Sequence, residues 1–400
     1  MKTFFRTLAA LLTLLPLCGA FAEPLTIQDI DPPLPQVWQR AYGAEITRRS
    51  YDFRVDQLTR LQAESGPDFF LVPTNTADYA ALRDGGWLLD LSSNPMIAAD
   101  TAALPPVFRS VVVEENGAVY GVPLCAVFED ELYWIPEAWE AAGLSASSAP
   151  DSFAELLDFL AAYAAQPPEG FCVFTRCFEP NPPFTYRRWL LLLLTDIWSV
   201  QAYGAGQAPH FSQPDFIALA ARTLEVGKAL DAADPASERE KLRLTPLFYG
   251  GGGRGRGYTA SGKAAYSLNN LLPHRVTAQQ PRLISVSLEL LCCRADSPWA
   301  DMAPAMLGEA IPFRQGWKTL YLHPDLGNLE RVNAEISVPT ARFTPEWLSS
   351  LSALTLTPVA APRFYTSASR DAYLALIDRA IKGMLSAEQF ARGLDGISQE

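Results

Sequence analysis

The sequence predicts an α/β protein in which a partly parallel sheet carries helices on both faces. The main observation is that helical and strand-like patterns alternate along residues 36–82. The second is the composition, because 49 % of the residues are apolar and 19 % are charged, which is enough apolar surface for a buried core. A length of 400 residues predicts two or three domains, or one two-lobed body.

The alternation begins with a helix and a strand that are separated by a glycine. Residues 37–52, VWQRAYGAEITRRSYD, predict a helix that stops at Gly43 and an alternating strand after it. Residues 54–65 place apolar side chains at helical spacing, and residues 66–74, GPDFFLVPT, predict a short buried strand. Residues 77–92, ADYAALRDGGWLLDLS, predict a helix that ends at a Gly-Gly pair and an apolar, strand-like piece after it.

Residues 116–144, NGAVYGVPLCAVFEDELYWIPEAWEAAGL, combine a core-like strand with polar side chains. A polar turn leads into the strand, acids at 129–131 interrupt it, and the aromatic pair Tyr133 and Trp134 comes before a helix. These acidic and aromatic side chains stand close together in a strand that otherwise has the composition of a core strand.

More helices are predicted downstream. In residues 149–168, APDSFAELLDFLAAYAAQPP, Asp151 or Ser152 can cap a helix, and Glu155 completes a capping box with Ser152. We assign no elements to residues 281–360. The other predicted helices cover residues 186–200, residues 214–230 and the tail from residue 369, which breaks at Gly383.

The charge limits the classes of partner. The formal net charge is −12, and an acidic surface disfavours nucleic acid and anionic membranes as partners. The same surface is compatible with a neutral or cationic small ligand.

The first 22 residues are typical of an export signal. A basic start, MKTFFR, precedes the apolar run TLAALLTLLPL, and Ala20-Phe21-Ala22 fits a cleavage site before Glu23. The apolar run is too short to span a bilayer comfortably. The alternative is lipid attachment at Cys18, although Leu17 stands where such sites favour a small residue. We expect an exported protein, free after cleavage at Ala22 or anchored through Cys18.

Cysteines and histidines argue against a metal site and a redox site. Five cysteines follow Ala22, so they cannot all pair within the chain, although Cys172 and Cys177 could pair across a short loop. The adjacent Cys292 and Cys293 are predicted to be core residues. The three histidines lie far apart and no CxxC pair is present, so we expect no metal and no cofactor.

Several of these segments, in this order, resemble a bacterial extracellular solute-binding protein of an ABC importer, of the family 1-like group with sugar-binding and polyamine-binding members. Residues 66–92 resemble the family's strand, helix and G-x-L-x-D-L segment, and residues 116–144 resemble its G-x-x-Y-G-V-P strand and the following helix. Residues 148–163 and 258–268 resemble its P-x-T-W-x-E-L and F-x-x-G-K-A-A-M segments. The chain departs from the family at Ile135, where asparagine is common.

The resemblance implies a type II, two-lobed periplasmic-binding-protein-like fold, in which each lobe is a mixed sheet flanked by helices and the ligand cleft lies at a hinge. The implied organisation is as follows: residues 1–22, signal peptide; residues 23–127 and about 276–330, lobe 1; residues 128–275 and about 331–400, lobe 2 with the C-terminal helices.

The resemblance also implies that the strand within residues 116–134 crosses the hinge. Phe128, Glu129 and Asp130 are then expected to face the cleft, where an aromatic face stacks on a sugar ring and carboxylates accept hydrogen bonds. Tyr133 and Trp134 are expected to pack inside a lobe.

Five more residues are candidate ligand contacts. Asn75 and Thr76 occupy a turn from a strand to a helix, a position that ligands favour in α/β proteins. Trp189 opens the helix at 186–200, which begins near the cleft in the family. Asn269 and Asn270 follow the segment at 258–268, where the family's chain passes the cleft.

The implied function is capture of an extracytoplasmic solute by hinge closure and its delivery to the membrane subunits of an ABC permease. Aromatic abundance favours a carbohydrate, and we expect a monomer without catalytic residues. A polyamine or another small polar solute is the alternative, because acidic residues suit a cation. A ligand-sensing subunit of a signalling system, or an exported hydrolase with two carboxylates such as Asp130 with Asp196 or Glu179, are further alternatives.

Overall fold

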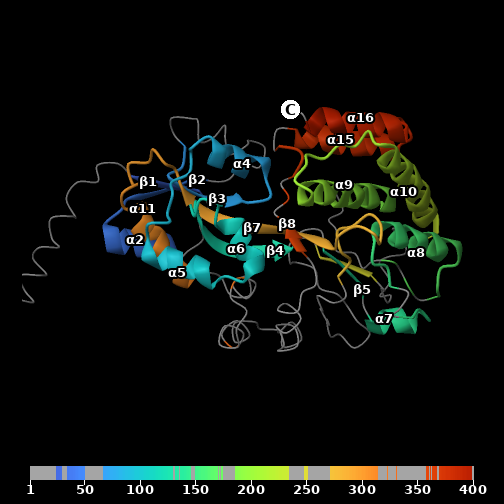
Figure 1. Ribbon diagram of the computed structural model, residues 1–400, viewed down its shortest axis with the longest axis horizontal. Coiled ribbons are helices and arrows are strands. Elements are labelled where there is room, and N and C mark those ends of the chain that lie inside the picture. Colours follow the sequence, from blue (N-terminus) through green and yellow to red (C-terminus); the bar gives the residue numbers. More distant parts are fainter. Residues whose placement is uncertain are drawn as a thin grey trace, which may run out of the picture.

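The computed structural model arranges its helices and strands in two groups that stand side by side (Figure 1). Each group has its own hydrophobic core. The structure describes residues 24–28, 34–49, 66–128, 131–134, 136–145, 149–169, 171, 173, 185–233, 247–250, 271–313, 322, 330, 357–359, 361, 363–366 and 369–398.

Several predictions fall on other residues and lie outside the described part of the chain. They are the signal peptide and Cys18, the helix at 54–65, Glu129 and Asp130, Cys172 and Cys177, Glu179, residues 258–268, and Asn269 and Asn270.

A mixed sheet forms the centre of the first group. Its strands are β1 (Leu25–Gln28), β2 (Ile46–Arg49), β3 (Phe69–Pro73), β4 (Val122–Phe128), β7 (Leu283–Cys293) and β8 (Thr357–Val359). The strand order is β2-β1-β3-β7-β4, and β8 also pairs with β7. β1 is parallel to β2 and β3, whereas β7 is antiparallel to both β3 and β4. β7 therefore lies between β3 and β4.

Helices cover both faces of this sheet. They are α2 (Leu34–Tyr42), α4 (Ala77–Asp84), α5 (Pro95–Ala103), α6 (Pro106–Val112), α11 (Ala303–Gly308) and the short 3-10 helix η6 (Ile311–Phe313). Figure 1 shows α4 on the opposite side of the sheet from α2. Trp38 of α2 packs edge-on against Phe69 with ring centroids 5.1 Å apart, and its indole nitrogen donates to the Met306 carbonyl at 3.0 Å. Phe69 and the adjacent Phe70 are both buried, as expected for a strand that is covered on two faces.

The second group is mostly helical. Its elements are the two-stranded sheet of β5 (Glu131–Trp134) and β6 (Leu247–Gly250), and the helices α7 (Pro136–Ala141), α8 (Phe153–Ala165), α9 (Tyr186–Gly204), α10 (Pro214–Ala233), α15 (Arg370–Ile381) and α16 (Ala387–Ser398). α9 runs beside α10 and α15 (Figure 1) and carries a buried run of leucines near its start. None of the helices in the described part of the chain has both the length and the apolar character needed to cross a membrane.

Local sequence signals locate several of these elements correctly. Ser152 caps α8 by accepting a hydrogen bond from the Glu155 amide at 3.3 Å, and the Glu155 carboxylate accepts one from the Asp151 amide at 2.8 Å. The predicted break between α15 and α16 is confirmed at Gly383, whose φ is 70°. The prediction that Cys292 and Cys293 are core residues is also confirmed.

The structure differs from the sequence prediction at three places. The single strand predicted before Trp134 is divided into β4 and β5, which belong to different sheets. The strand-like piece after Gly86 forms an isolated bridge, from Leu88 to Arg294, and further along the chain the Leu91 amide donates to the Val119 carbonyl at 2.7 Å. β1 and β7 were not predicted, although β7 is the longest strand of the described residues.

Candidate functional site

The turn between β3 and α4 carries two predicted site residues, Asn75 and Thr76. Thr76 is the N-cap of α4: its Oγ1 accepts a hydrogen bond from the Tyr79 amide at 3.3 Å and donates one to the Pro73 carbonyl at 2.9 Å. This cap satisfies an amide that the first helical turn leaves without a partner. Asn75 is only 5 % exposed, so the turn is well packed. Ligand contact by the two side chains stays a prediction.

β7 joins this turn to the strand that carries Phe128. The Thr74 amide donates to the Leu288 carbonyl at 2.9 Å, and the Leu288 amide donates to Thr74 Oγ1, also at 2.9 Å. On the other side of β7, Phe128 is paired with Val286. Two parts of the predicted site, which are about fifty residues apart in the sequence, therefore flank the same short stretch of one strand.

Glu289 directly follows this stretch and was not among the predicted site residues. It is paired with Pro73 of β3 and with Cys125 of β4. The Cys125 thiol donates a hydrogen bond to Glu289 Oε2 at 3.0 Å. The signal that could have found this residue is its isolation, since it is the only charged residue in the run LISVSLELLCC.

The chain returns to the turn near its C-terminal end. The Arg363 amide donates a hydrogen bond to the Asn75 carbonyl at 2.5 Å. The Arg363 guanidinium lies 5.8 Å from the ring centroid of Tyr365, and this ring stacks on Tyr373 of α15 at 4.7 Å. A segment that packs on the second core thus makes a backbone contact with the first group beside the predicted site.

Trp189, the predicted site residue on α9, lies in the second core. Its side chain belongs to the cluster formed by α8, α9 and α10 and is 4 % exposed. Burial of this kind is typical of packing, and ligand contact by Trp189 stays a prediction. Tyr133 and Trp134 are also packed, with Tyr133 buried and Trp134 against the second core, as expected.

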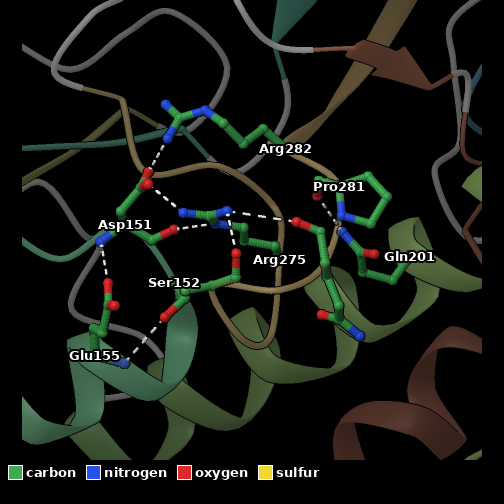
Figure 2. A network of polar contacts seen from close by, with 9 residues as sticks. Asp151, Ser152, Glu155, Gln201, Arg275, Pro281 and Arg282 are labelled. Carbon is green, nitrogen blue, oxygen red and sulfur yellow. Dashed lines mark hydrogen bonds and ion pairs between the residues drawn. The ribbon is translucent and has the colours of Figure 1, made fainter.

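A network of polar side chains holds the segment that leads into β7 (Figure 2). Arg275 and Arg282 both contact the carboxylate of Asp151, at the start of α8. Arg275 also donates to the carbonyls of Asp151 and Ala278. Because the Arg275 side chain is largely buried, pairing it with a carboxylate offsets the cost of removing its charge from water.

α9 supports the same segment from a second direction. The Gln201 side chain donates to the carbonyls of His274 and Pro281, the latter at 3.0 Å (Figure 2). One turn further along, Gly204 packs so closely on Leu283 that a Cβ there would lie 2.4 Å from Leu283 Cδ1. The first residues of β7 are therefore fixed to the second group by α8 and α9.

The buried thiols have no catalytic character. Burial raises the pKa of Cys292 and of Cys293 well above the ordinary range, so both stay protonated and are poor nucleophiles. Among the described residues, no three His, Cys, Asp or Glu side chains come together as a metal-binding group.

A separate cavity of about 270 Å³ lies on the first group, beside α5 and α6. None of the predicted site residues contributes to it. Its walls are formed by Ser92, Ala98, Thr101, Ala102, Arg109, Val113, Gly117 and Val119.

No protein-family model matches the sequence, and no curated protein is significantly similar to it. Solved structures match over nearly the whole chain. A solute-binding protein of an ABC transporter from Agrobacterium radiobacter, in complex with ribitol, is 15 % identical with a TM-score of 0.56, and the match covers 94 % of this chain and 100 % of that one.

Two more matches have the same extent. An ABC substrate-binding protein from Listeria monocytogenes, in complex with cycloalternan, is 13 % identical with a TM-score of 0.56, and the match covers 94 % of this chain and 98 % of that one. The cyclic α-maltosyl-1,6-maltose binding protein from Arthrobacter globiformis is 14 % identical with a TM-score of 0.55 and the same two coverages. Together with the two cores, these matches confirm the predicted fold class, a two-lobed, periplasmic-binding-protein-like α/β fold.

Proposed function

We propose that this protein is an extracytoplasmic solute-binding protein that captures a carbohydrate or polyol between its two lobes and delivers it to an ABC permease. The observation that carries the proposal is the match, over almost the full length of both chains, with solute-binding proteins of such transporters. Ribitol and cycloalternan, the ligands named for two of these structures, are both uncharged and rich in hydroxyl groups. The protein would bind its solute without chemical change.

The arrangement of the two cores supports a closing motion. β7 is paired with β3 and β4 of the first group, while its first residues are held by α8 and α9 of the second. A strand that is fixed at both ends to different bodies can act as a hinge between them. Solute bound between the lobes would then favour the closed arrangement by contacting both.

We propose the lobe limits that the sequence suggested. The first core takes its residues from Leu25 to Tyr133 and from Leu271 to Leu322, and the second from Leu132 to Val276 and beyond Phe364. These ranges support lobe 1 as residues 23–127 and about 276–330, and lobe 2 as residues 128–275 and about 331–400. Tyr133, Leu271 and β8 are exceptions, because they belong to the first core or its sheet.

Export and a membrane partner belong to the same proposal. The signal-like residues 1–22 support release after Ala22, with lipid attachment at Cys18 as the alternative. The partner would be the membrane subunits of the permease, to which a monomeric binding protein presents its solute.

The proposal is tested by thermal unfolding of the purified protein against a panel of solutes. The panel holds ribitol, mannitol, xylo-oligosaccharides and malto-oligosaccharides, with spermidine, amino acids and inorganic anions as contrasting classes. A solute at about a hundred times its dissociation constant adds about 2.7 kcal/mol to the free energy of unfolding, which raises Tm by several degrees. Only saccharides or polyols should raise Tm, and chromatography should recover them unchanged. A response only to spermidine, or consumption of a saccharide, would contradict the proposal.

A further inference from the structure

Glu289 differs in burial from the rest of β7. Every other residue of β7 is buried, whereas Glu289 is half-buried. Residues that are paired directly across strands place their side chains on the same face of a sheet, so Glu289 shares a face with Pro73 and Cys125. Pro73 is also only partly buried, which means that this face is accessible at the point where β3 ends.

The surroundings of Glu289 are those of a binding position. The Thr74–Leu288 hydrogen bonds fix the β3–α4 turn directly beside it. On its other side, β4 continues from Cys125 to Phe128, the last residue before the chain leaves the first sheet. The carboxylate therefore lies beside the end of β3, and Val286, which pairs with Phe128 at the end of β4, is three residues away along β7.

The chemistry of the group limits what it can recognise. An ionised carboxylate only accepts hydrogen bonds, and its two oxygens offer about four acceptor positions. The Cys125 thiol donates a hydrogen bond to Oε2, and a thiol is a weak donor. A carboxylate held in this way accepts hydrogen bonds from hydroxyl groups and repels an anion.

We propose that Glu289 is a specificity-determining residue of the solute site: it accepts hydrogen bonds from the hydroxyl groups of an uncharged saccharide or polyol and disfavours solutes that carry a carboxylate. Cys125 acts through Glu289 as its positioning residue. The inference rests on the proposed function and makes it more specific, because it separates neutral solutes from acidic ones.

The test compares neutral solutes with their acids by titration calorimetry. The pairs are ribitol and ribonate, mannitol and mannonate, glucose and glucuronate, and maltotriose and maltotrionate. The wild type should bind at least one neutral member and prefer it over its acid. Glu289→Gln keeps the size of the side chain and removes its charge, so this preference should fall by about tenfold or more.

Two more variants distinguish the loss of a ligand contact from a loss of folding. Glu289→Ala should weaken the binding of the neutral probe by about tenfold or more. Cys125→Ala should weaken this binding less, and should leave the preference for the neutral solute over its acid intact. The matched control is Glu114→Gln, which removes another partly buried carboxylate of the first group, one that pairs with Arg83. It should change neither affinity nor preference, and thermal unfolding of each variant reports whether it is folded.

The outcomes distinguish this inference from the proposed function. If the wild type binds no neutral probe of the set, both are overturned. If the wild type binds a neutral probe and folded Glu289→Gln binds the pair with unchanged affinities, Glu289 is not the selecting group and only this inference is overturned. A wild type that prefers the acids also contradicts it.

Discussion

Asp395 of α16 shows how one carboxylate can tie distant segments together. It accepts hydrogen bonds from the amides of Phe211 at 2.6 Å and Ser212 at 2.9 Å, in the segment between α9 and α10, and it also contacts His210 at 3.1 Å. Burial acts to raise the pKa of this carboxyl, but the hydrogen bonds from Ser212 and Phe211 and the nearby His210 lower it overall. The ionised form is therefore the one that the fold stabilises.

This depressed pKa predicts how stability depends on pH. A carboxyl whose pKa is lower in the folded state stabilises the fold above its unfolded pKa, about 3.9, and this contribution is lost as the pH falls through the folded value. Asp395→Asn should lower the free energy of unfolding by about 1–3 kcal/mol near neutral pH. In urea unfolding, its difference from the wild type should shrink below about pH 4.

The exposed Asp301 offers the matched control for this change. Asp301→Asn should alter the free energy of unfolding by less than about 0.5 kcal/mol at either pH, because a surface carboxylate contributes little. A difference between Asp395→Asn and the wild type that is the same at acid and neutral pH would show that the charge of Asp395 has no role.

At the scale of secondary-structure elements, the junction between the two C-terminal helices depends on a glycine. Gly383 has a φ of 70°, a conformation that costs other residues roughly 1–2 kcal/mol, and no atom lies near the position of a Cβ. Gly396 lies within α16 with an ordinary φ and an equally open Cβ position. The two glycines therefore differ in backbone conformation and not in space.

Matched alanine substitutions should consequently have opposite signs. Gly383→Ala should lower the free energy of unfolding by roughly 1 kcal/mol, and Gly396→Ala should raise it by up to about 1 kcal/mol because alanine favours helix. Chemical denaturation of both variants checks the pair. Destabilisation by both, to the same extent, would mean that α15 and α16 are not separated by a left-handed turn at Gly383.

Local signals predicted elements whose determinants are near in sequence. The Ser152 cap and the Gly383 break were identified because capping and backbone conformation involve only a few neighbouring residues. β7 was missed although its residues 284–290, ISVSLEL, alternate apolar and polar side chains as a strand does. Its two serines are buried with the apolar residues, because the strand is covered on both faces.

The residues of the candidate site also differ in whether local sequence patterns could predict them. Asn75 and Thr76 were predicted from the local pattern of a strand followed by a helix, and the structure places both in that turn. Glu289 was not found, since its partners Pro73 and Cys125 are more than 160 residues away and the pairing is set by the tertiary fold. Trp189 shows a limit of local patterns, because they do not distinguish a tryptophan that begins a helix beside a ligand from one that lies within a core, as Trp189 does.

At the scale of the whole molecule, the account depends on two bodies that share one strand. Asn75, Thr76 and Glu289 lie on or beside the sheet of the first body, and the C-terminal segment reaches Asn75 from the second body through the Arg363 amide. Solute that contacts both bodies would shift the population toward a closed form.

The central claim is that a hydroxyl-rich solute binds between the lobes and closes them, and small-angle X-ray scattering tests it most directly. The measurement compares the protein alone with the protein saturated by the saccharide or polyol that raises Tm most. The account predicts that the radius of gyration becomes smaller and that the scattering curve becomes that of a more compact particle. Scattering that is identical with and without saturating solute would contradict closure on the solute.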